Sequence, residues 1–173
     1  MYRFVWPTAA PQLTLTVHHG PSGLPRGELA FQLGGVASLY RESTTWIIRL
    51  GEAAPAGPAS RAVTLGNSGT TGTLVVDPDQ VPQSGAGYPL EYPLEDLLFR
   101  HLLADRRALV VHACGVAWGG KGYLFVGSSG AGKSTTACLW EASGARVLND
   151  DRVVVEAAPD AIRIHPTPWF GEY

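Results

Sequence analysis

Cysteine, net charge and long apolar runs are all scarce in this chain. Its 173 residues include two Cys, and 13 Lys and Arg stand against 15 Asp and Glu. Since neither half of the sequence is a basic arm, we expect no nucleic-acid or membrane partner. No stretch approaches the ~18 uninterrupted apolar residues of a membrane-spanning helix, and the N-terminus lacks the apolar core and cleavage site of a signal peptide. These absences predict a cytoplasmic protein.

The two cysteines, Cys114 and Cys138, are too few for a secreted disulfide framework. Neither has a second Cys or a His at zinc-ligand spacing, so we expect reduced thiols. Hydrophobic residues make up 45% of the chain, which is too many for a disordered protein. A globular chain of this length buries roughly 70% of its unfolded surface, which predicts one large domain or two small ones.

The first half of the chain, residues 1–88, consists of short alternating or apolar runs between clusters of turn residues. Alternation with a period of two is typical of half-buried strands. The expected strands are Leu13–Val17, Glu28–Leu33, Thr45–Leu50, Ala62–Leu65 and Thr71–Val76. The pattern predicts a small antiparallel sheet or sandwich, joined near Ser84–Gly87 to a second domain that spans residues 89–173.

Helical periodicity begins after residue 88. The expected elements are a helix over Pro93–Leu103, a strand over Ala108–Ala117, a turn over Gly119–Gly122, a strand over Tyr123–Val126, a helix over Lys133–Ser143, a strand at Val147–Leu148, and a hairpin of Arg152–Glu156 with Ala161–His165. Leu94, Leu97, Leu98 and Leu102 give the first helix an apolar stripe. Gly144 follows the second helix at the position where glycine commonly ends helices.

One segment of the second domain carries a specific chemical signal. Gly127–Ser134 fits the phosphate-loop pattern G-x-x-x-x-G-K-[ST] at every fixed position, between an apolar strand and a helix. Its glycines permit the backbone conformations that aim several N–H groups at an anion, and the helix N-terminus adds partial positive charge. The expected phosphate-binding residues are Gly127, Ser128, Ser129, Gly130, Ala131, Gly132, Lys133, Ser134 and Thr135.

Within this motif, Lys133 is expected to reach the β- and γ-phosphates of a nucleotide, and Ser134 to ligate Mg²⁺. Asp150 and Asp151 follow a short apolar strand, where a carboxylate can hold Mg²⁺ directly or through water. We expect one of the two acids to face the metal and the other to orient the attacking hydroxyl.

His112 interrupts an otherwise apolar strand. If Trp118 pairs with Tyr123 across the following turn, antiparallel pairing places His112 opposite Ser129, inside the phosphate loop. An imidazole there can ligate the metal, pair with an acid or move a proton. We therefore expect His112 to be a functional residue.

The order of these elements resembles the C-terminal domain of HPr kinase/phosphorylase, and it is similar to the wider phosphoenolpyruvate carboxykinase superfamily. The resemblance covers roughly residues 90–173, about half the chain. It implies an α/β fold, in which a P-loop core with a mixed sheet follows the β-rich N-terminal region. It also implies ATP and Mg²⁺ as cofactors. Carried over by residue, it makes Lys133 a catalytic residue that cradles the phosphates, Asp150 the base or the orienting residue, and Ser134 and Asp151 the metal ligands. His112, the remaining catalytic candidate, would sit beside them.

The sequence departs from that family at Thr135, where HPr kinases usually place Glu, and it shows no counterpart of their substrate-docking loop and C-terminal helices. Two alternatives to an ATP-dependent kinase therefore stay open. One is a non-catalytic ATP-binding module. The other is a carboxykinase-related small-molecule enzyme, although the Lys and Arg positions of carboxykinases have no convincing equivalents. The phosphoryl acceptor is a protein, a peptide or a small molecule, and an exposed sheet edge favours a homo-oligomer.

Overall fold

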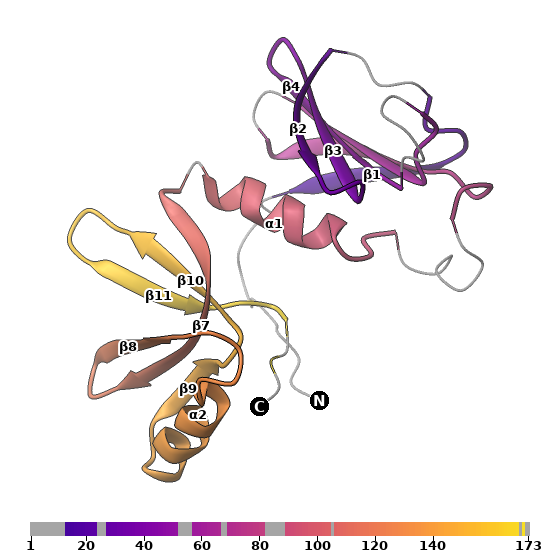
Figure 1. Ribbon diagram of the computed structural model, residues 1–173. Coiled ribbons are helices and arrows are strands. Elements are labelled where there is room, and N and C mark those ends of the chain that lie inside the picture. The colour runs from indigo at the N-terminus through magenta and orange to yellow at the C-terminus, as the bar shows by residue number, and fades with distance from the viewer. Residues whose placement is uncertain are drawn as a thin grey trace. The chain divides into compact units, whose positions relative to one another are not determined.

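The computed structural model describes residues 13–23, 27–51, 57–66, 69–81, 89–104, 106–169 and 171. The chain divides into two compact units between Leu102 and Leu103 (Figure 1). The first unit contains a six-stranded sheet and all but the last two residues of helix α1, and the second contains a five-stranded sheet and helix α2. The domain joint that we expected at Ser84–Gly87 lies outside the described residues.

The sheet of the first unit has the strand order β1-β6-β5-β4-β3-β2. Its strands are β1 (Thr14–His19), β2 (Glu28–Leu33), β3 (Ala37–Glu42), β4 (Thr45–Leu50), β5 (Arg61–Leu65) and β6 (Thr71–Val76). Neighbouring strands pair antiparallel, except that β1 pairs parallel with β6. The five strands expected from the sequence are confirmed to within one or two residues, whereas β3 was not predicted.

Helix α1 (Leu94–Ala104) packs on the apolar face of this sheet with Leu94, Leu97 and Leu98 of its expected stripe. Leu94 and Leu98 are buried together with Ile48, Val63 and Leu74 from the sheet. Asp96 and Arg100 form an ion pair at 2.8 Å on the helix. No helix among the described residues is long and apolar enough to cross a membrane.

The sheet of the second unit is built around one long strand, β7 (Ala108–Trp118), which lies between β8 and β10 (Figure 1). The other strands are β8 (Lys121–Val126), β9 (Arg146–Asn149), β10 (Arg152–Ala157) and β11 (Ile162–Pro166). The C-terminal half of β7 pairs with β8 and β9, and its N-terminal half pairs with β10. Every one of these pairings is antiparallel.

Helix α2 (Lys133–Ala142) packs on one face of the second sheet. Trp140 lies with its ring centroid 5.0 Å from that of Tyr123 and 5.9 Å from that of Phe125. Gly144 follows the helix with φ of 88°, which confirms the expected end. On the other face, a Cβ at Gly115 would lie 2.9 Å from a methyl group of Val153, so glycine at this position leaves room for the Val153 side chain.

The α/β fold class that we expected is wrong. The described chain is mostly strand, and its second unit is an antiparallel sheet with a single helix rather than a P-loop α/β core. The strand that follows α2, β9, pairs antiparallel with β7 instead of adding a parallel strand beside β8. The expected order of elements in the second unit is confirmed, but their pairing depends on long-range register that local patterns do not specify.

The predicted turn after β7 also needs correction. Trp118 pairs with Lys121 and not with Tyr123, so the turn is the two residues Gly119 and Gly120. Both have positive φ, 57° and 74°, as the tight two-residue turns of antiparallel hairpins require. The shift is two residues, and the β7–β8 ladder begins at Ala113 and Val126, so His112 does not lie opposite Ser129 as we expected.

Candidate phosphate-binding site

The glycine-rich loop leaves β8 after Val126 and enters α2 at Lys133. Gly130 and Gly132 have φ of 79° and 88°, a region that favours glycine, so the predicted need for glycine at these two positions is confirmed. Gly127 is required for a different reason. A Cβ there would lie 2.8 Å from the Cβ of Ala131, which is too close. The three glycines thus allow the chain to fold back on itself in front of the helix.

The N-terminus of α2 has the polarity that an anion requires. Gly132 is the N-cap residue and makes no side-chain capping bond, and the first turn of the helix carries no acidic residue. The partial positive charge of the helix end is therefore not offset by a carboxylate within that turn. Thr136 closes the turn by donating from its N and Oγ1 to the carbonyl of Gly132, at 2.8 and 2.9 Å.

Lys133 points back into the loop. Its Nζ donates to the carbonyl of Gly127 at 3.1 Å and to that of Ser128 at 3.0 Å. The ammonium therefore sits at the concave side of the loop, where an incoming phosphate would meet it. An anion is a stronger hydrogen-bond partner for the Lys133 ammonium than two neutral carbonyls are, so a phosphate oxygen can replace them.

Ser134 and Asp150 connect the loop to the acid pair. The hydroxyl of Ser134 donates to Oδ2 of Asp150 at 2.6 Å, and Asp150 is only 4% exposed. Beneath them, burial and the nearby Asp150 carboxylate raise the pKa of the Cys114 thiol, while the Lys133 ammonium acts in the opposite direction. Cys114 thus lies in the electrostatic field of both charged groups.

His112 contacts Asp151 rather than Asp150. Its Nδ1 lies 3.0 Å from Oδ1 of Asp151 and 3.0 Å from the main-chain oxygen of the same residue. Since both atoms are acceptors, we place the imidazole hydrogen on Nδ1, which leaves Nε2 as an acceptor in the neutral ring. The other carboxylate oxygen of Asp151 pairs with Nε of Arg152 at 3.2 Å. The imidazole is about half exposed, so a ligand can reach it.

The acid pair lies between β9 and β10, two strands that pair one after the other with the same edge of β7. Asn149, the last residue of β9, pairs with Gly115, and Arg152, the first residue of β10, pairs with His112. Between these pairs, the amide of Ala113 donates to the carbonyl of Asp151 at 3.0 Å. The acids therefore project from a short break in the ladder, directly beside His112.

Asn149 is a residue of this site whose role sequence reasoning missed. Its Oδ1 accepts from the amides of Asp151 and Arg152, at 2.8 and 2.9 Å, and its Nδ2 donates to the carbonyl of Trp169 at 2.7 Å. An Asn two residues before a chain reversal commonly accepts such bonds, and that signal was available in the sequence.

These elements enclose a cavity of about 270 Å³. Its lining residues are His112, Ser129, Gly130, Gly132, Lys133, Ser134, Thr135, Asp150 and Asp151. Each of them was a candidate from the sequence, and the fold brings them together from β7, the loop, α2 and the acid turn. Gly127, Ser128 and Ala131 belong to the loop but not to the cavity wall.

Comparisons with protein-family models, with characterised proteins and with solved structures found no match to this chain. The resemblance to the HPr kinase family therefore stays a prediction, and the residues of the cavity carry the functional argument. Among the described residues, no group of three or more His, Cys, Asp or Glu side chains is arranged to hold a metal ion. A cation here would depend on ligand oxygens in addition to protein groups.

Proposed function

We propose that this cavity binds the phosphates of ATP with Mg²⁺ and transfers a phosphoryl group to an acceptor hydroxyl. The observation that carries the proposal is the convergence, in one cavity, of a glycine-rich loop, its lysine, a Ser–Asp pair and a His–Asp pair. Phosphoryl transfer requires mainly positioning and neutralisation of charge, and these are the groups that supply both.

The loop is the proposed phosphate-binding element. Its backbone N–H groups and the N-terminus of α2 offer donors to phosphate oxygens, and Lys133 supplies a full positive charge. Ligand pockets commonly enclose about 300–1,000 Å³. The cavity, at about 270 Å³, suits a polyphosphate tail rather than a complete nucleotide. We therefore propose that the nucleoside lies outside the cavity wall.

Ser134 and Asp150 fit a magnesium ion. Mg²⁺ is usually held by one or two carboxylates together with substrate phosphates and water, so a hydroxyl and a carboxylate in contact are a suitable protein share. The ion would neutralise charge on the phosphates. We expected Asp151 to be the metal partner, but the contacts lead us to propose Asp150 in that role.

His112 and Asp151 are the proposed proton-handling pair. Asp151 accepts from Nδ1 and thereby orients the ring, so Nε2 is left to accept the proton of an acceptor hydroxyl. A positioned general base of this kind contributes about 10²–10⁴-fold in rate. This reverses the division between the two acids that we expected, since Asp150 is the more buried of the two and is bonded to the loop.

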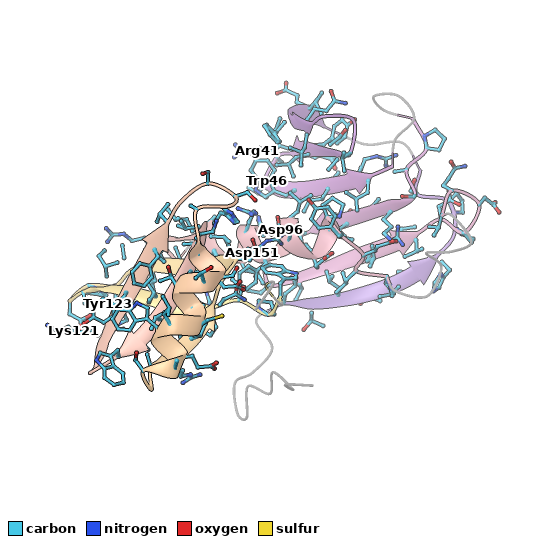
Figure 2. All side chains as sticks on the ribbon, turned by 60° about the horizontal axis from the view of Figure 1, so that its bottom comes forward. Arg41, Trp46, Asp96, Lys121, Tyr123 and Asp151 are labelled. Carbon is cyan, nitrogen blue, oxygen red and sulfur yellow. The ribbon has the colours of Figure 1, made fainter. Side chains whose placement is uncertain are left out.

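The two lysines of the chain provide a matched test. Lys121 lies at the hairpin end of β8, far from Asp151 (Figure 2), and its removal changes the net charge by the same amount as removal of Lys133. Calorimetric titration with ATP, with and without Mg²⁺, should give binding for the wild type and for Lys121→Ala. Lys133→Ala should lose most of it.

Equal ATP affinity of the two lysine variants would overturn the proposed phosphate site. Transfer is tested separately, by incubation with labelled ATP and candidate hydroxyl acceptors. Binding that depends on Lys133 but is followed by neither transfer nor hydrolysis would identify a non-catalytic nucleotide-binding module instead.

A further inference from the structure

We infer that Asn149 is the positioning residue of the acid pair, and that it acts by joining the Asp150–Asp151 turn to the C-terminal residues around Trp169. Its contribution to catalysis rests on the proposed function, but its contribution to the geometry does not. The inference follows from three independent sets of contacts.

The first set fixes the turn itself. Where the chain leaves the β7 ladder, Oδ1 of Asn149 accepts from the amides of both Asp151 and Arg152. These two bonds determine the direction of the backbone that carries both acids. Asn149 is itself held by pairing with Gly115 on β7, so the turn is fastened to the central strand of the sheet.

The second set ties the C-terminal residues to the same turn. Nδ2 of Asn149 donates to the carbonyl of Trp169, and Oγ1 of Thr167 donates to the carbonyl of Arg152 at 2.9 Å. The guanidinium of Arg152 lies over the indole ring of Trp169, 5.3 Å from its centroid. A side-chain-to-carbonyl hydrogen bond on each side of the acids and one cation–π contact thus hold the two segments together.

The third contact reaches the Asp150 carboxylate. A Cβ at Gly171 would collide with Oδ1 of Asp150 and would lie 2.8 Å from its Cγ. The backbone of Gly171 therefore lies against one carboxylate oxygen, while Ser134 donates to the other. Asp150 is confined from two sides, and Asn149 is the side chain that connects the turn with the segment on the second side.

A positioning role for Asn149 predicts an effect that the loss of a purely structural residue would not produce. If Asn149 sets the position of the acids, its loss should weaken the binding of Mg²⁺ to the site more than it weakens the binding of phosphate to the loop. Residues that orient metal ligands in this way typically change metal affinity by about 10–100-fold. The loop has its own glycines and its own helix end, so it should be affected little.

The test compares Asn149→Ala with Asn149→Ser. The serine hydroxyl can still accept from the backbone two residues further on, but it cannot reach Trp169 as the amide does. We expect Asn149→Ala to raise the Mg²⁺ concentration for half-maximal stimulation of ATP binding about tenfold or more. ATP binding without Mg²⁺ should stay within about twofold of the wild type. Asn149→Ser should recover part of the Mg²⁺ response.

Amide hydrogen exchange separates this inference from the proposed function. In Asn149→Ala, the amides of Asp151 and Arg152 should exchange faster than in the wild type, whether or not ATP binds. Wild-type exchange at both amides would overturn the inference, as would an equal loss of ATP affinity with and without Mg²⁺. A wild-type chain that binds no ATP would overturn the proposed function, and faster exchange would then still support Asn149 as the residue that fixes the turn.

Gly171→Ala provides a second variant that approaches Asp150 from the other side. The added methyl group must displace either the carboxylate or the C-terminal segment. We expect the same rise in the required Mg²⁺ concentration as for Asn149→Ala, with normal protection of the Asp151 amide. An unchanged Mg²⁺ response in Gly171→Ala would contradict the role given to the C-terminal residues.

Discussion

The hydroxyl of Ser134 lies 2.6 Å from Oδ2 of Asp150 and donates a hydrogen bond to it. This bond joins the first turn of α2 to the break between β9 and β10, two segments that are both attached to β7. Its short length is typical of a hydroxyl that donates to an ionised carboxylate. Because Asp150 is almost fully buried, the bond also satisfies an acceptor that water does not easily reach.

Ser134→Ala should therefore destabilise the second unit. The substitution leaves a buried carboxylate oxygen without its donor, which typically costs about 1–3 kcal/mol of unfolding free energy. Ser143→Ala is the matched control, because Ser143 is exposed and its hydroxyl only donates to the carbonyl of Leu139 in the last turn of the same helix. Urea unfolding of both variants measures the difference. Equal stabilities would show that the bond to Asp150 contributes nothing.

Asp151→Asn should separate transfer from binding. The amide keeps the shape of the side chain but removes the negative charge beside Nδ1 of His112, so it no longer stabilises the positive charge that the ring gains when Nε2 accepts a proton. We expect ATP affinity within about twofold of the wild type and a fall in the transfer rate of about 10²-fold or more. Single-turnover assays with labelled ATP measure the rate. A variant with the wild-type rate would exclude the His112–Asp151 pair from the proton-handling role.

The two thiols should differ in reactivity. Cys114 is buried and Cys138 is exposed, so a thiol reagent should modify Cys138 quickly in the native protein and Cys114 only after unfolding. Mass spectrometry of the labelled peptides identifies the modified residue. Rapid labelling of Cys114 under native conditions would contradict its burial in the core beneath α2.

The same thiol should make stability depend on pH in the alkaline range. The pKa of Cys114 is raised in the folded protein, chiefly by burial, so the unfolded chain loses this proton first as the pH rises. The contribution to stability is complete below the usual cysteine pKa of about 8.5 and decreases as the pH approaches the higher folded value. Urea midpoints across this range, for the wild type and Cys114→Ala, measure the effect. The decrease should be smaller in the variant.

Leu94→Ala tests how α1 is held to the first sheet. Leu94 is fully buried against the sheet, so its truncation should cost about 2–5 kcal/mol. Leu29 on β2 is 47% exposed, and Leu29→Ala should cost much less. Thermal or denaturant unfolding of the two variants gives the comparison. Similar losses would mean that the helix contributes little to the stability of this unit.

Local structure was largely predictable from the sequence, because periodicity and turn residues report it directly. The helix expected over Pro93–Leu103 is found as Leu94–Ala104, and strands β2, β4 and β6 have the expected bounds. The residues of the glycine-rich loop could be proposed from the sequence, because few backbone conformations place several amides around an anion and those conformations favour glycine. These predictions needed no knowledge of which strands are neighbours.

Tertiary pairing was not predictable in the same way. Strand β3 was missed because buried Ala37 and Tyr40 do not alternate with polar residues as a half-buried strand would. The α/β expectation came from the motif and from the order of elements, whereas fold class depends on which strands pair. The bond from Asn149 to Trp169 depends on residues near the C-terminus, which no local pattern contains.

The long strand β7 determines how a ligand would reach the proposed site. Its register with β8 sets where the glycine loop begins, and its pairing with β9 and β10 sets where the carboxylates project. Both groups are thus positioned by strands that pair with β7. Folding alone therefore orders both the glycine loop and the carboxylates. A ligand would find the proposed site already assembled, and it would lose little binding free energy to ordering the site.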